Sequence, residues 1–499
     1  MAVSDVDVVV VGGGNAGIVA ALAAREAGAQ VALLERGDVD HAGGNSYFTA
    51  GATRIVHGGL DDLLTLVEPD TRHAATVVPA YTAEDFDADL RKVTEGNNDP
   101  DLTRTLIAEG RATLQWLHDT HGVKYRLMYE RQAYERADGT YLFWGGLHVG
   151  NVDGGVGLVR DETRAAHSAG VRILYGHHVQ RLLFEGERVV GVEGETNGVP
   201  FQIRARSVVI AAGGFEADPA LRQEHLGSGW EHAKVRGTPF NTGELLIAAT
   251  EAGAARGGDW NTCHSVAWDA EYPENEGNRE LTNRLTRQSY PLGVVVNREG
   301  RRFLDEGADF RNYTYAKYGR EILRQPGSVA YQLFDATTRP MLRPEEYDMP
   351  GVSVYQADSI TELAEQAGID PHQLGEEIAA FNSSIDRSVS FDPNVKDGRR
   401  AGVAPPKSNW ALPIETPPFY AYPVTCGITF TFGGLKADID GRVLRESREP
   451  VDGLYVAGEA LGGLFSKNYP GGTGLAAGIV FGRRAGRTAG STPSSRDIP

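Results

Sequence analysis

Cysteine is nearly absent from this chain. Two thiols occur in 499 residues, Cys263 and Cys426, and neither belongs to a C-x-x-C pair. A disulfide framework, a zinc site and an iron–sulfur site all need more cysteines or closer spacing. We therefore expect no metal centre and two reduced thiols, as is typical of a cytoplasmic protein.

Long hydrophobic runs and an excess of basic residues are also missing. The longest uncharged stretch, Val8 to Ala24, is shorter than the ~20 residues of a membrane span and is interrupted by glycines. Acidic residues precede it, where a signal peptide carries positive charge. The 49 Lys and Arg against 67 Asp and Glu give a formal net charge of −18, which disfavours nucleic-acid binding. We expect a cytoplasmic protein with no integral membrane segment and no nucleic-acid partner.

Glycine, by contrast, is abundant, and its first cluster follows a run of valines. Asp7 to Val11 is a β-branched segment typical of a strand buried on both faces of a parallel sheet. The glycines that follow fit a tight turn, close approach to a pyrophosphate and packing of a helix on the strand. A helix expected from Ile18 to Ala27 and a second strand ending at Glu35 complete a dinucleotide site, in which Glu35 would bind a ribose hydroxyl. The expected cofactor contacts here are Gly12, Gly14, Asn15, Ala16, Gly17, Glu35 and Arg36.

Later segments favour FAD over NAD, a choice that the glycine motif leaves open. Residues 41–51 are small and hydroxylated and suit a flat ring, although alone they could form a surface loop. Residues 205–214 and 453–459 are further buried strands, and the second reaches an acid suited to a ribitol hydroxyl. Residues 469–478 open a helix whose amino terminus could stabilise negative charge on a reduced flavin. The expected contacts are Gly44, Asn45, Ser46, Thr49, Ala50, Gly51, Ala212, Gly213, Gly458, Glu459, Gly474 and Leu475.

In this order, the G-x-G-x-x-G, GGNS, A-x-GG and AGE segments resemble the flavoprotein family of fumarate reductase and succinate dehydrogenase. The resemblance implies FAD as the cofactor and a backbone contact between Val179 and the adenine. It also implies a helix that starts at residues 241–245, with Thr242 as its N-cap. The histidine that attaches FAD in succinate dehydrogenase has a different local sequence, so we expect non-covalent FAD and a structural role for His41.

The nucleotide-binding segments lie near residues 7–60, 172–216 and 451–486, so both ends of the chain are expected to form one domain. The sequence predicts an α/β fold: a discontinuous, glutathione-reductase-like Rossmann-type FAD-binding domain with an inserted α+β capping domain. We place the FAD-binding domain at 1–254 and 355–499 and the capping or substrate domain at 255–354. Ser359 and Asp370 each begin a capping box that opens a helix.

Oxidation of a carbon–carbon bond beside a carbonyl or carboxyl group needs a hydride acceptor, a proton-exchanging group and an anchor for the substrate oxygen. In fumarate reductases a histidine matches His264, and an arginine near the position of Arg311 delivers the proton, so the resemblance implies catalytic roles for both. A solvated ion pair for Arg311 and a hydrogen-bonded core position for His264 are the alternatives. Tyr290 and Tyr469 complete the catalytic candidates. Arg311 or a tyrosine would exchange the proton, and His264 and Tyr469 would hold the substrate oxygen, although Tyr469 could equally pack against the flavin edge as structure.

Two departures from the fumarate reductases concern cationic anchors. Residues 427–434 lack a substrate-binding histidine, and Tyr469 stands where those enzymes carry a carboxylate-clamping arginine. Because a dicarboxylate needs paired positive donors in a dry site, these losses argue against fumarate itself. Long strings such as residues 263–269 and 284–293 resemble FAD-dependent tricarballylate dehydrogenases, whereas the turn at 469–474 is more similar to 3-ketosteroid dehydrogenases.

The sequence therefore predicts an FAD-dependent dehydrogenase that forms a carbon–carbon double bond in a small organic substrate and passes the hydride to flavin N5. Tricarballylate-like acids and ketones are the expected substrates. An enoate or enone reductase is the alternative direction, and a flavoprotein that only relays electrons is the alternative class. Because the sequence holds no heme-binding C-x-x-C-H motif or cluster motif, a separate protein, a quinone or dioxygen is expected to exchange electrons with it.

Overall fold

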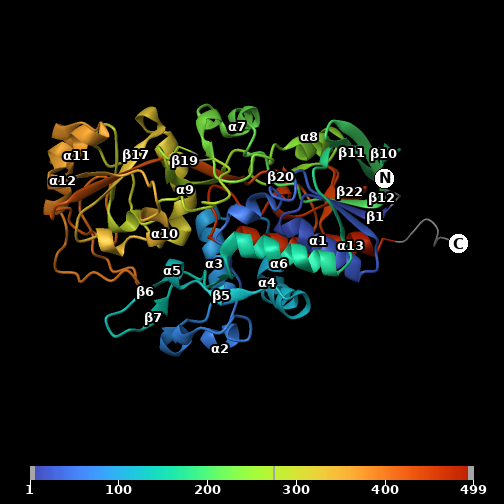
Figure 1. Ribbon diagram of the computed structural model, residues 1–499, viewed down its shortest axis with the longest axis horizontal. Coiled ribbons are helices and arrows are strands. Elements are labelled where there is room, and N and C mark those ends of the chain that lie inside the picture. The colour runs from blue at the N-terminus through green and yellow to red at the C-terminus, as the bar shows by residue number, and fades with distance from the viewer. Residues whose placement is uncertain (1–5, 274–275, 493–499) are drawn as a thin grey trace.

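Two sheets at opposite ends of an elongated molecule dominate the computed structural model, which describes residues 6–273 and 276–492. Figure 1 places the first sheet with helices α1 and α13 at one end, and β17 with α11 and α12 at the other. Strands from both ends of the chain meet in the first sheet, where β22 is joined to β1 through β12. The discontinuous α/β fold predicted from the sequence is confirmed.

The first sheet has eight strands in the order β10-β11-β12-β1-β2-β9, with β22 beside β12 and β21 beside β22. β1, β2, β9, β12 and β22 run parallel, whereas β10 to β12 form an antiparallel meander. The central valines of β1 are fully buried, because both faces of this strand are covered. The strands are β1 (Val6–Val11), β2 (Val31–Leu34), β9 (Arg172–Leu174), β10 (His178–Glu185), β11 (Arg188–Thr196), β12 (Val199–Ile210), β21 (Arg442–Leu444) and β22 (Pro450–Val456).

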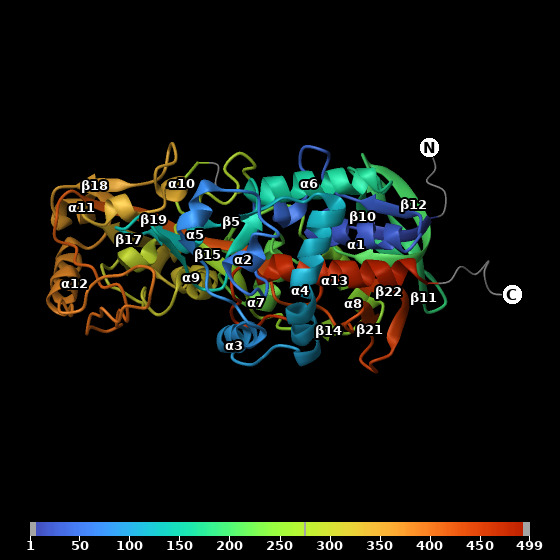
Figure 2. The ribbon, with the colours of Figure 1, turned by 90° about the horizontal axis from the view of Figure 1, so that it is seen from below.

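Glycine lets the last helix lie directly against the first. α13 (Thr473–Gly490) and α1 (Asn15–Glu26) run side by side in Figure 2. A Cβ atom added at Gly482 would lie 2.5 Å from the carbonyl oxygen of Ala16, and one added at Gly486 would lie 2.0 Å from that of Ala20. A larger residue at either position would push the helices apart. This close packing brings the first turns of both helices into one pocket.

The second sheet has six strands built around the long strand β19. Its path is β13-β19-β17-β16, and β15 and β18 also pair with β19. Helix α9 (Arg311–Leu323) lies on β15, where a Cβ atom at Gly319 would be 2.6 Å from the backbone of Ser265. The strands are β13 (Lys234–Val235), β15 (Cys263–Asp269), β16 (Val294–Asn297), β17 (Ala330–Phe334), β18 (Tyr355–Ala357) and β19 (Phe419–Thr431).

A separate apolar core attaches two helices to the second sheet. Leu363 of α11 (Ile360–Ala367) and Phe381 of α12 (Pro371–Ser383) pack with Val294 and Leu333 of the strands. Both predicted helix starts are confirmed. Ser359 Oγ accepts a hydrogen bond of 3.2 Å from the N–H of Glu362, and the Asp370 carboxylate accepts one of 2.9 Å from that of Gln373.

The predicted N-cap at Thr242 is wrong. α8 (Glu244–Glu251) begins one residue later, behind Gly243, whose φ of +75° only glycine adopts without strain. The hydroxyl of Thr242 instead accepts a hydrogen bond of 2.8 Å from Nη1 of Arg36. A local sequence pattern could not reveal this tertiary contact.

The second sheet extends beyond the predicted capping domain on both sides. β18 and β19 pair with each other, and β17 pairs with β19, although residues 355–499 were assigned to the FAD-binding domain. β13, before residue 255, also pairs with β19. We therefore propose that the second domain includes the segment from β18 to β19 as well as residues 255–354, and that the chain returns to the first domain after β19.

The remaining elements connect and cover the two sheets. Within residues 6–273 and 276–492, no helix has the length and apolar character needed to cross a membrane. The helices are α2 (Leu60–Leu63), α3 (Ala83–Thr94), α4 (Pro100–His121), α5 (Tyr129–Gln132), α6 (Gly154–Ser168), α7 (Pro219–Leu226) and α10 (Pro344–Tyr347). The strands are β3 (Ala52–Thr53), β4 (Thr76–Val77), β5 (Tyr125–Leu127), β6 (Ala133–Glu135), β7 (Tyr141–Phe143), β8 (Val149–Asn151), β14 (Arg256–Gly257) and β20 (Gly434–Leu435).

Candidate active site

One large pocket collects residues from nearly the whole chain. Its empty space is about 1870 Å³ with the open mouth included. The lining has two parts. We call the glycine turns, strand ends and helix starts the nucleotide part. The arginine part consists of Arg131, Arg236, Asn283, Gln288, Arg311, Tyr315, Thr429 and Tyr469.

The glycine turn after β1 is shaped for close approach of a ligand to the backbone. Gly12 has φ +106°, and a Cβ atom there would lie 2.3 Å from the carbonyl oxygen of Ala211. Gly14 caps α1 without a side-chain hydrogen bond, so the first turn of this helix presents backbone to the pocket. A helix amino terminus that carries free N–H groups and partial positive charge binds phosphate. These features fit the pyrophosphate of a dinucleotide.

Glu35 stands at the end of β2, as predicted. Its carboxylate accepts hydrogen bonds from the N–H groups of Gly13 (2.8 Å) and Gly37 (2.7 Å), so it also holds the glycine turn in place. Burial raises the pKa of Glu35, while these backbone donors act in the opposite direction. Glu35 lines the pocket. Its contact with a ribose hydroxyl stays a prediction.

The start of α13 supplies a second helix amino terminus to the pocket. Gly472 caps the helix with φ +82° and offers no side-chain hydrogen bond. Asn15 of α1 ties the two helix starts together, because its Nδ2 donates a hydrogen bond of 3.0 Å to the carbonyl of Leu475. This terminus can stabilise the negative charge that a flavin gains on reduction.

Most predicted cofactor contacts line the pocket, and two do not. Gly17 lies behind the turn, where a Cβ atom would be 1.9 Å from the carbonyl oxygen of Gly12, and Gly51 packs against Gly154. His41 is exposed, outside the lining, with Nδ1 2.7 Å from the Asp38 carboxylate. The predicted residues in the lining are Gly12, Gly14, Asn15, Ala16, Glu35, Arg36, Gly44, Asn45, Ser46, Thr49, Ala50, Val179, Ala212, Gly213, Gly458, Glu459, Gly474 and Leu475.

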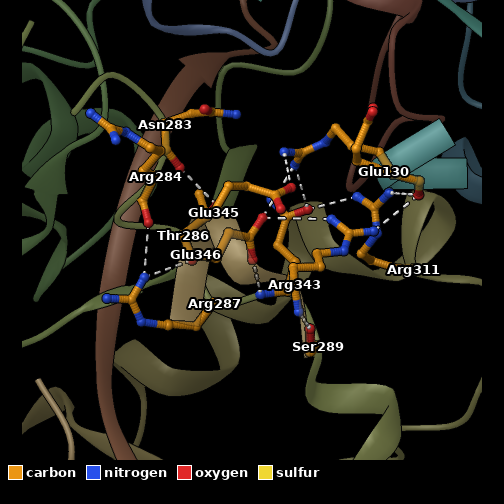
Figure 3. Close-up of polar contacts among 12 residues, drawn as sticks. Glu130, Asn283, Arg284, Thr286, Arg287, Ser289, Arg311, Arg343, Glu345 and Glu346 are labelled. Carbon is orange, nitrogen blue, oxygen red and sulfur yellow. Dashed lines mark hydrogen bonds and ion pairs between the residues drawn. The ribbon is translucent and has the colours of Figure 1, made fainter. Parts of the chain in front are cut away.

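Arg311 begins α9 and is held in place by a network that Figure 3 shows. Its Nη1 donates a hydrogen bond of 2.6 Å to Gln288, and its Nη2 donates one of 2.8 Å to the carbonyl of Arg131. Burial lowers the pKa of Arg311 well below its usual value, and the positive charges of Arg343 and Arg131 lower it further. The structure places this predicted residue in the pocket lining with a guanidinium that gives up a proton more readily than a solvated one.

The carboxylate of Glu346 neutralises the neighbours of Arg311. It lies 3.4 Å from Nη2 of Arg131 and 3.5 Å from Nη1 of Arg343, and all three side chains are largely buried. Its second oxygen accepts a hydrogen bond of 2.8 Å from the N–H of Gln288. Figure 3 shows that Glu346 and Arg343 lie together with Arg311, so α10 and the residue before it help to position that guanidinium.

Arg236 is a pocket residue that the sequence did not single out. It follows β13 and is 8% exposed, and its Nη1 donates a hydrogen bond of 3.0 Å to the hydroxyl of Thr429. Its Nε has no hydrogen-bond partner among the described residues. Within residues 6–273 and 276–492, neither Arg236 nor Arg311 forms an ion pair with a carboxylate of the protein. The pocket is therefore richer in cations than the two departures from fumarate reductases suggested.

Two tyrosines join the arginine part to the start of α13. The hydroxyl groups of Tyr315 and Tyr469 lie 2.6 Å apart, and both side chains line the pocket. Burial raises the pKa of Tyr469 well above its usual value, so this hydroxyl stays protonated and can donate. The predicted Tyr469 is thus in a position to bind a substrate oxygen, and Tyr315 joins it.

His264 and Tyr290 lie outside the pocket lining. The ring of His264 stacks on Phe430 at 5.2 Å and meets the edges of Tyr315 and Tyr469, with neither nitrogen hydrogen-bonded to another side chain. Tyr290 is buried with its hydroxyl 2.6 Å from that of Thr314. Their catalytic roles stay predictions, and the contacts observed here are those of packed core residues.

Several lining residues escaped the sequence analysis. Arg131 precedes β6, Arg236 follows β13, and Gln288 comes from the segment before β16. No local motif marks Arg131 or Arg236, and Gln288 stood in the string 284–293 without being singled out. These residues meet only when segments far apart in the sequence pack together. Tyr315 had a usable signal: it lies four residues after Arg311 in a helical segment, and such residues share one helix face.

Known proteins resemble this chain over nearly its whole length. It is 27% identical over 493 residues to an NADH:fumarate oxidoreductase from Klebsiella pneumoniae, covering 97% of this chain but 47%, about half, of that longer protein. It is 28% identical over 383 residues to a 3-oxosteroid 1-dehydrogenase from Mycolicibacterium smegmatis, covering 70% of this chain and 65% of the relative. A flavocytochrome c3 fumarate reductase in an open conformation superposes with a TM-score of 0.72 at 26% identity, over 98% of this chain and 78% of that one.

These likenesses agree with the geometry of the nucleotide part. The glycine turn, the acid after β2 and the two helix starts are the features that a dinucleotide requires. A family model described as an FAD binding domain matches residues 7–475, so the chain belongs to this family of FAD-dependent oxidoreductases.

Proposed function

We propose that this protein oxidises a carbon–carbon single bond beside a carboxyl group of a small organic acid, using FAD as hydride acceptor. One observation carries the proposal: Arg236 and Arg311 bring two buried guanidinium groups to the pocket, and no carboxylate among the described residues pairs with either. One relative is named as an NADH:fumarate oxidoreductase. Sequence strings such as residues 284–293 resemble tricarballylate dehydrogenases. Fumarate and tricarballylate are both carboxylic acids.

A substrate carboxylate would compensate the buried positive charge in the pocket. Keeping a cation out of water is expensive unless an anion or several hydrogen bonds replace the lost solvent. Arg236 has a single side-chain partner, the hydroxyl of Thr429. A substrate carboxylate would supply the missing charge and could accept two parallel hydrogen bonds from one guanidinium. The neutral body of a steroid would leave both cations uncompensated.

Four residues of the arginine part then have definite tasks. Arg236 anchors a carboxylate and so orients the substrate. Arg311 exchanges the proton on the carbon beside the acid group, since its burial and the positive charges of Arg343 and Arg131 lower the pKa of its guanidinium and so favour loss of the proton. The hydroxyl groups of Tyr315 and Tyr469 donate to a substrate oxygen on which negative charge develops. FAD held by the nucleotide part would supply the hydride acceptor or donor.

The direction of the reaction is set by the electron partner. The same groups serve an enoate reductase, since both directions share one transition state. A ketone substrate is the second candidate, favoured by the hydroxyl pair of Tyr315 and Tyr469 and by the likeness to a 3-oxosteroid 1-dehydrogenase. We propose a separate protein, a quinone or dioxygen as the electron partner.

Anaerobic mixing tests the proposal. The purified protein with bound FAD is combined separately with tricarballylate, succinate and a 3-ketosteroid, and the flavin absorbance is followed. Bleaching by a carboxylic acid supports the proposal, and bleaching by the ketosteroid alone overturns it. The reverse arm starts from chemically reduced protein and adds the matching unsaturated acids, so that return of the absorbance identifies a reductase. Failure of every acid in both arms would also overturn the assignment to carboxylic acids.

A further inference from the structure

A buried carboxyl group stands directly behind the nucleotide part of the pocket. Glu216 is fully buried and does not line the pocket, yet three residues that do line it make contact with it. These three are Asn45, Asn241 and Glu459, and they come from separate segments of the chain. Nothing in the proposed reaction requires Glu216.

Two amide groups bind one oxygen of this carboxylate. Asn45 and Asn241 each donate a hydrogen bond from Nδ2 to Oε1 of Glu216, both at 2.6 Å. Asn45 also donates to the carbonyl of Thr429 at 2.7 Å, and its own oxygen accepts from the N–H of Thr238 at 2.8 Å. Glu216 therefore fixes the GGNS turn and the segment before α8 in one arrangement. Charge-assisted bonds of this kind favour the ionised form of the acceptor.

Another acid lies against Glu216. The side chains of Glu216 and Glu459 are hydrogen-bonded to each other, and no N–H or hydroxyl of the described residues reaches Oε2 of Glu216. Glu459 in turn accepts a hydrogen bond of 2.8 Å from the N–H of Thr431. Two carboxyl groups in contact, one of them fully buried, cannot both ionise without a large cost, so one proton lies between them.

Within residues 6–273 and 276–492, no cation forms an ion pair with Glu216 or Glu459. Arg222 of α7 acts electrostatically on Glu216, but its guanidinium donates to the main-chain carbonyl of Glu216 at 2.6 Å and to the carbonyls of Trp230, Glu231 and Ala233. Cys263 of β15 also interacts electrostatically with Glu216. Burial raises the pKa of Glu459 well above its usual value, and the charge of Glu216 raises it further.

We propose that Glu216 is a positioning residue that keeps Glu459 protonated, so that the FAD pocket presents a neutral carboxylic acid whose shared proton controls how tightly FAD is held. With the proton in place, the pair carries one negative charge behind the pocket lining. Loss of the proton adds a second charge on Glu459, which faces the site of an anionic dinucleotide. FAD affinity should therefore fall as the pH rises.

The test measures FAD affinity without substrate, so it is independent of the proposed reaction. The dissociation constant of FAD is determined by flavin fluorescence for the full chain from about pH 6 to about pH 10, the range in which buried glutamates with raised pKa values titrate. For the unchanged protein, we expect the logarithm of Kd to rise with pH, with a slope of at most about one, the signature of one proton.

Two variants separate the shared proton from a general structural role. Glu216→Gln removes the like charge and donates an N–H to Glu459, which then ionises at ordinary pH, so FAD should bind more weakly at pH 6 and with a flat profile. Glu459→Gln carries a permanent N–H toward Glu216, so its profile should also be flat and its affinity at pH 9 higher than that of the unchanged protein.

The outcomes decide the proposal in either direction. A sloping profile in the unchanged protein and flat profiles in both variants support it. A flat profile in the unchanged protein overturns it, and so does a slope that persists in the variants. If Glu216→Gln does not fold, Glu459→Gln alone decides, because loss of the slope supports the shared proton and its persistence excludes it.

Discussion

The nucleotide part and the arginine part of the pocket are built by different means. The first is made of backbone: glycines at turns, strand ends and the first turns of α1 and α13. The second is made of side chains that reach the pocket from segments as distant as Arg131 and Tyr469. Backbone recognition suits a cofactor that is the same throughout a family, and side-chain recognition suits a substrate that varies among its members.

This difference also separates what each part tolerates. At Gly12 a Cβ atom would lie 2.3 Å from the main-chain carbonyl oxygen of Ala211, so any side chain there must displace the turn itself. An arginine in the arginine part can be replaced without moving the backbone, and the replacement weakens substrate binding or slows turnover. Substitutions in the two parts should therefore affect different measured quantities.

The largest effect is expected from Gly17→Ala. The new Cβ atom would lie 1.9 Å from the carbonyl oxygen of Gly12, so the glycine turn must move and the phosphate site with it. We expect a protein that purifies without bound FAD and is inactive. Gly375→Ala in α12 is the matched control, because nothing lies within 4 Å of its Cβ atom. Equal flavin content in the two variants would contradict the assignment of this turn.

Arg311→Gln should leave FAD in place and slow the reaction. Glutamine keeps a hydrogen-bond donor but cannot exchange a proton, so turnover should fall by at least ~100-fold, the lower range for lost general acid–base catalysis. The measurement is the rate of flavin bleaching at saturating substrate. Arg91→Gln, an exposed position on α3, serves as control. A rate within a few-fold of the unchanged protein would remove Arg311 from the mechanism.

Arg236→Gln should weaken substrate binding more than turnover. Losing a charge-assisted hydrogen-bond pair costs about 1.5–3 kcal/mol, so KM for a carboxylic acid should rise roughly 10- to 150-fold. Arg36→Gln is the counterpart in the nucleotide part and should change FAD affinity while KM stays the same. A rise in KM from Arg36→Gln and none from Arg236→Gln would reverse the division of the pocket, and a ketone substrate would be insensitive to Arg236→Gln.

Most cofactor contacts expected from the sequence line the pocket, and there is a physical reason for this agreement. Turns with positive φ or close backbone contacts admit only glycine, so a short run of residues predicts their geometry. Gly12 has φ +106°, and a Cβ atom at Gly17 would meet the carbonyl oxygen of Gly12. The acid at Glu35 follows from the length of one strand–helix–strand unit. Gly17 and Gly51 were expected to touch the cofactor and instead support the turns behind it.

The arginine part could not be predicted in the same way. Its composition depends on where β13, α9 and the segment before β6 meet after folding, and no periodicity within those segments encodes the meeting point. Fumarate reductases suggested only two positions for cationic anchors, and this chain lacks a cation at both. Arg236 and Arg131 reach the same pocket from other segments, after β13 and before β6.

The smallest effect concerns His264, which the sequence placed in the reaction and the structure places behind Tyr469. Burial, and then the charge of Arg236, lower its pKa well below 6.5. An unfolded chain takes up a proton on this histidine below about pH 6.5, and the folded chain does not, so acid favours unfolding by up to about 1.4 kcal/mol per pH unit. His264→Phe, stacked on Phe430 as the imidazole is, removes this proton uptake.

Thermal unfolding at pH values between about 5 and 7 tests this account of His264. The melting temperature of the unchanged protein should fall more steeply toward low pH than that of His264→Phe. Some slope should remain in the variant, because burial also lowers the pKa of His57, to about 4. Identical slopes would mean that the folded protein protonates His264 as readily as the unfolded chain does. A charged His264 beside Tyr315 and Tyr469 would then belong to the arginine part of the pocket and not to the apolar core.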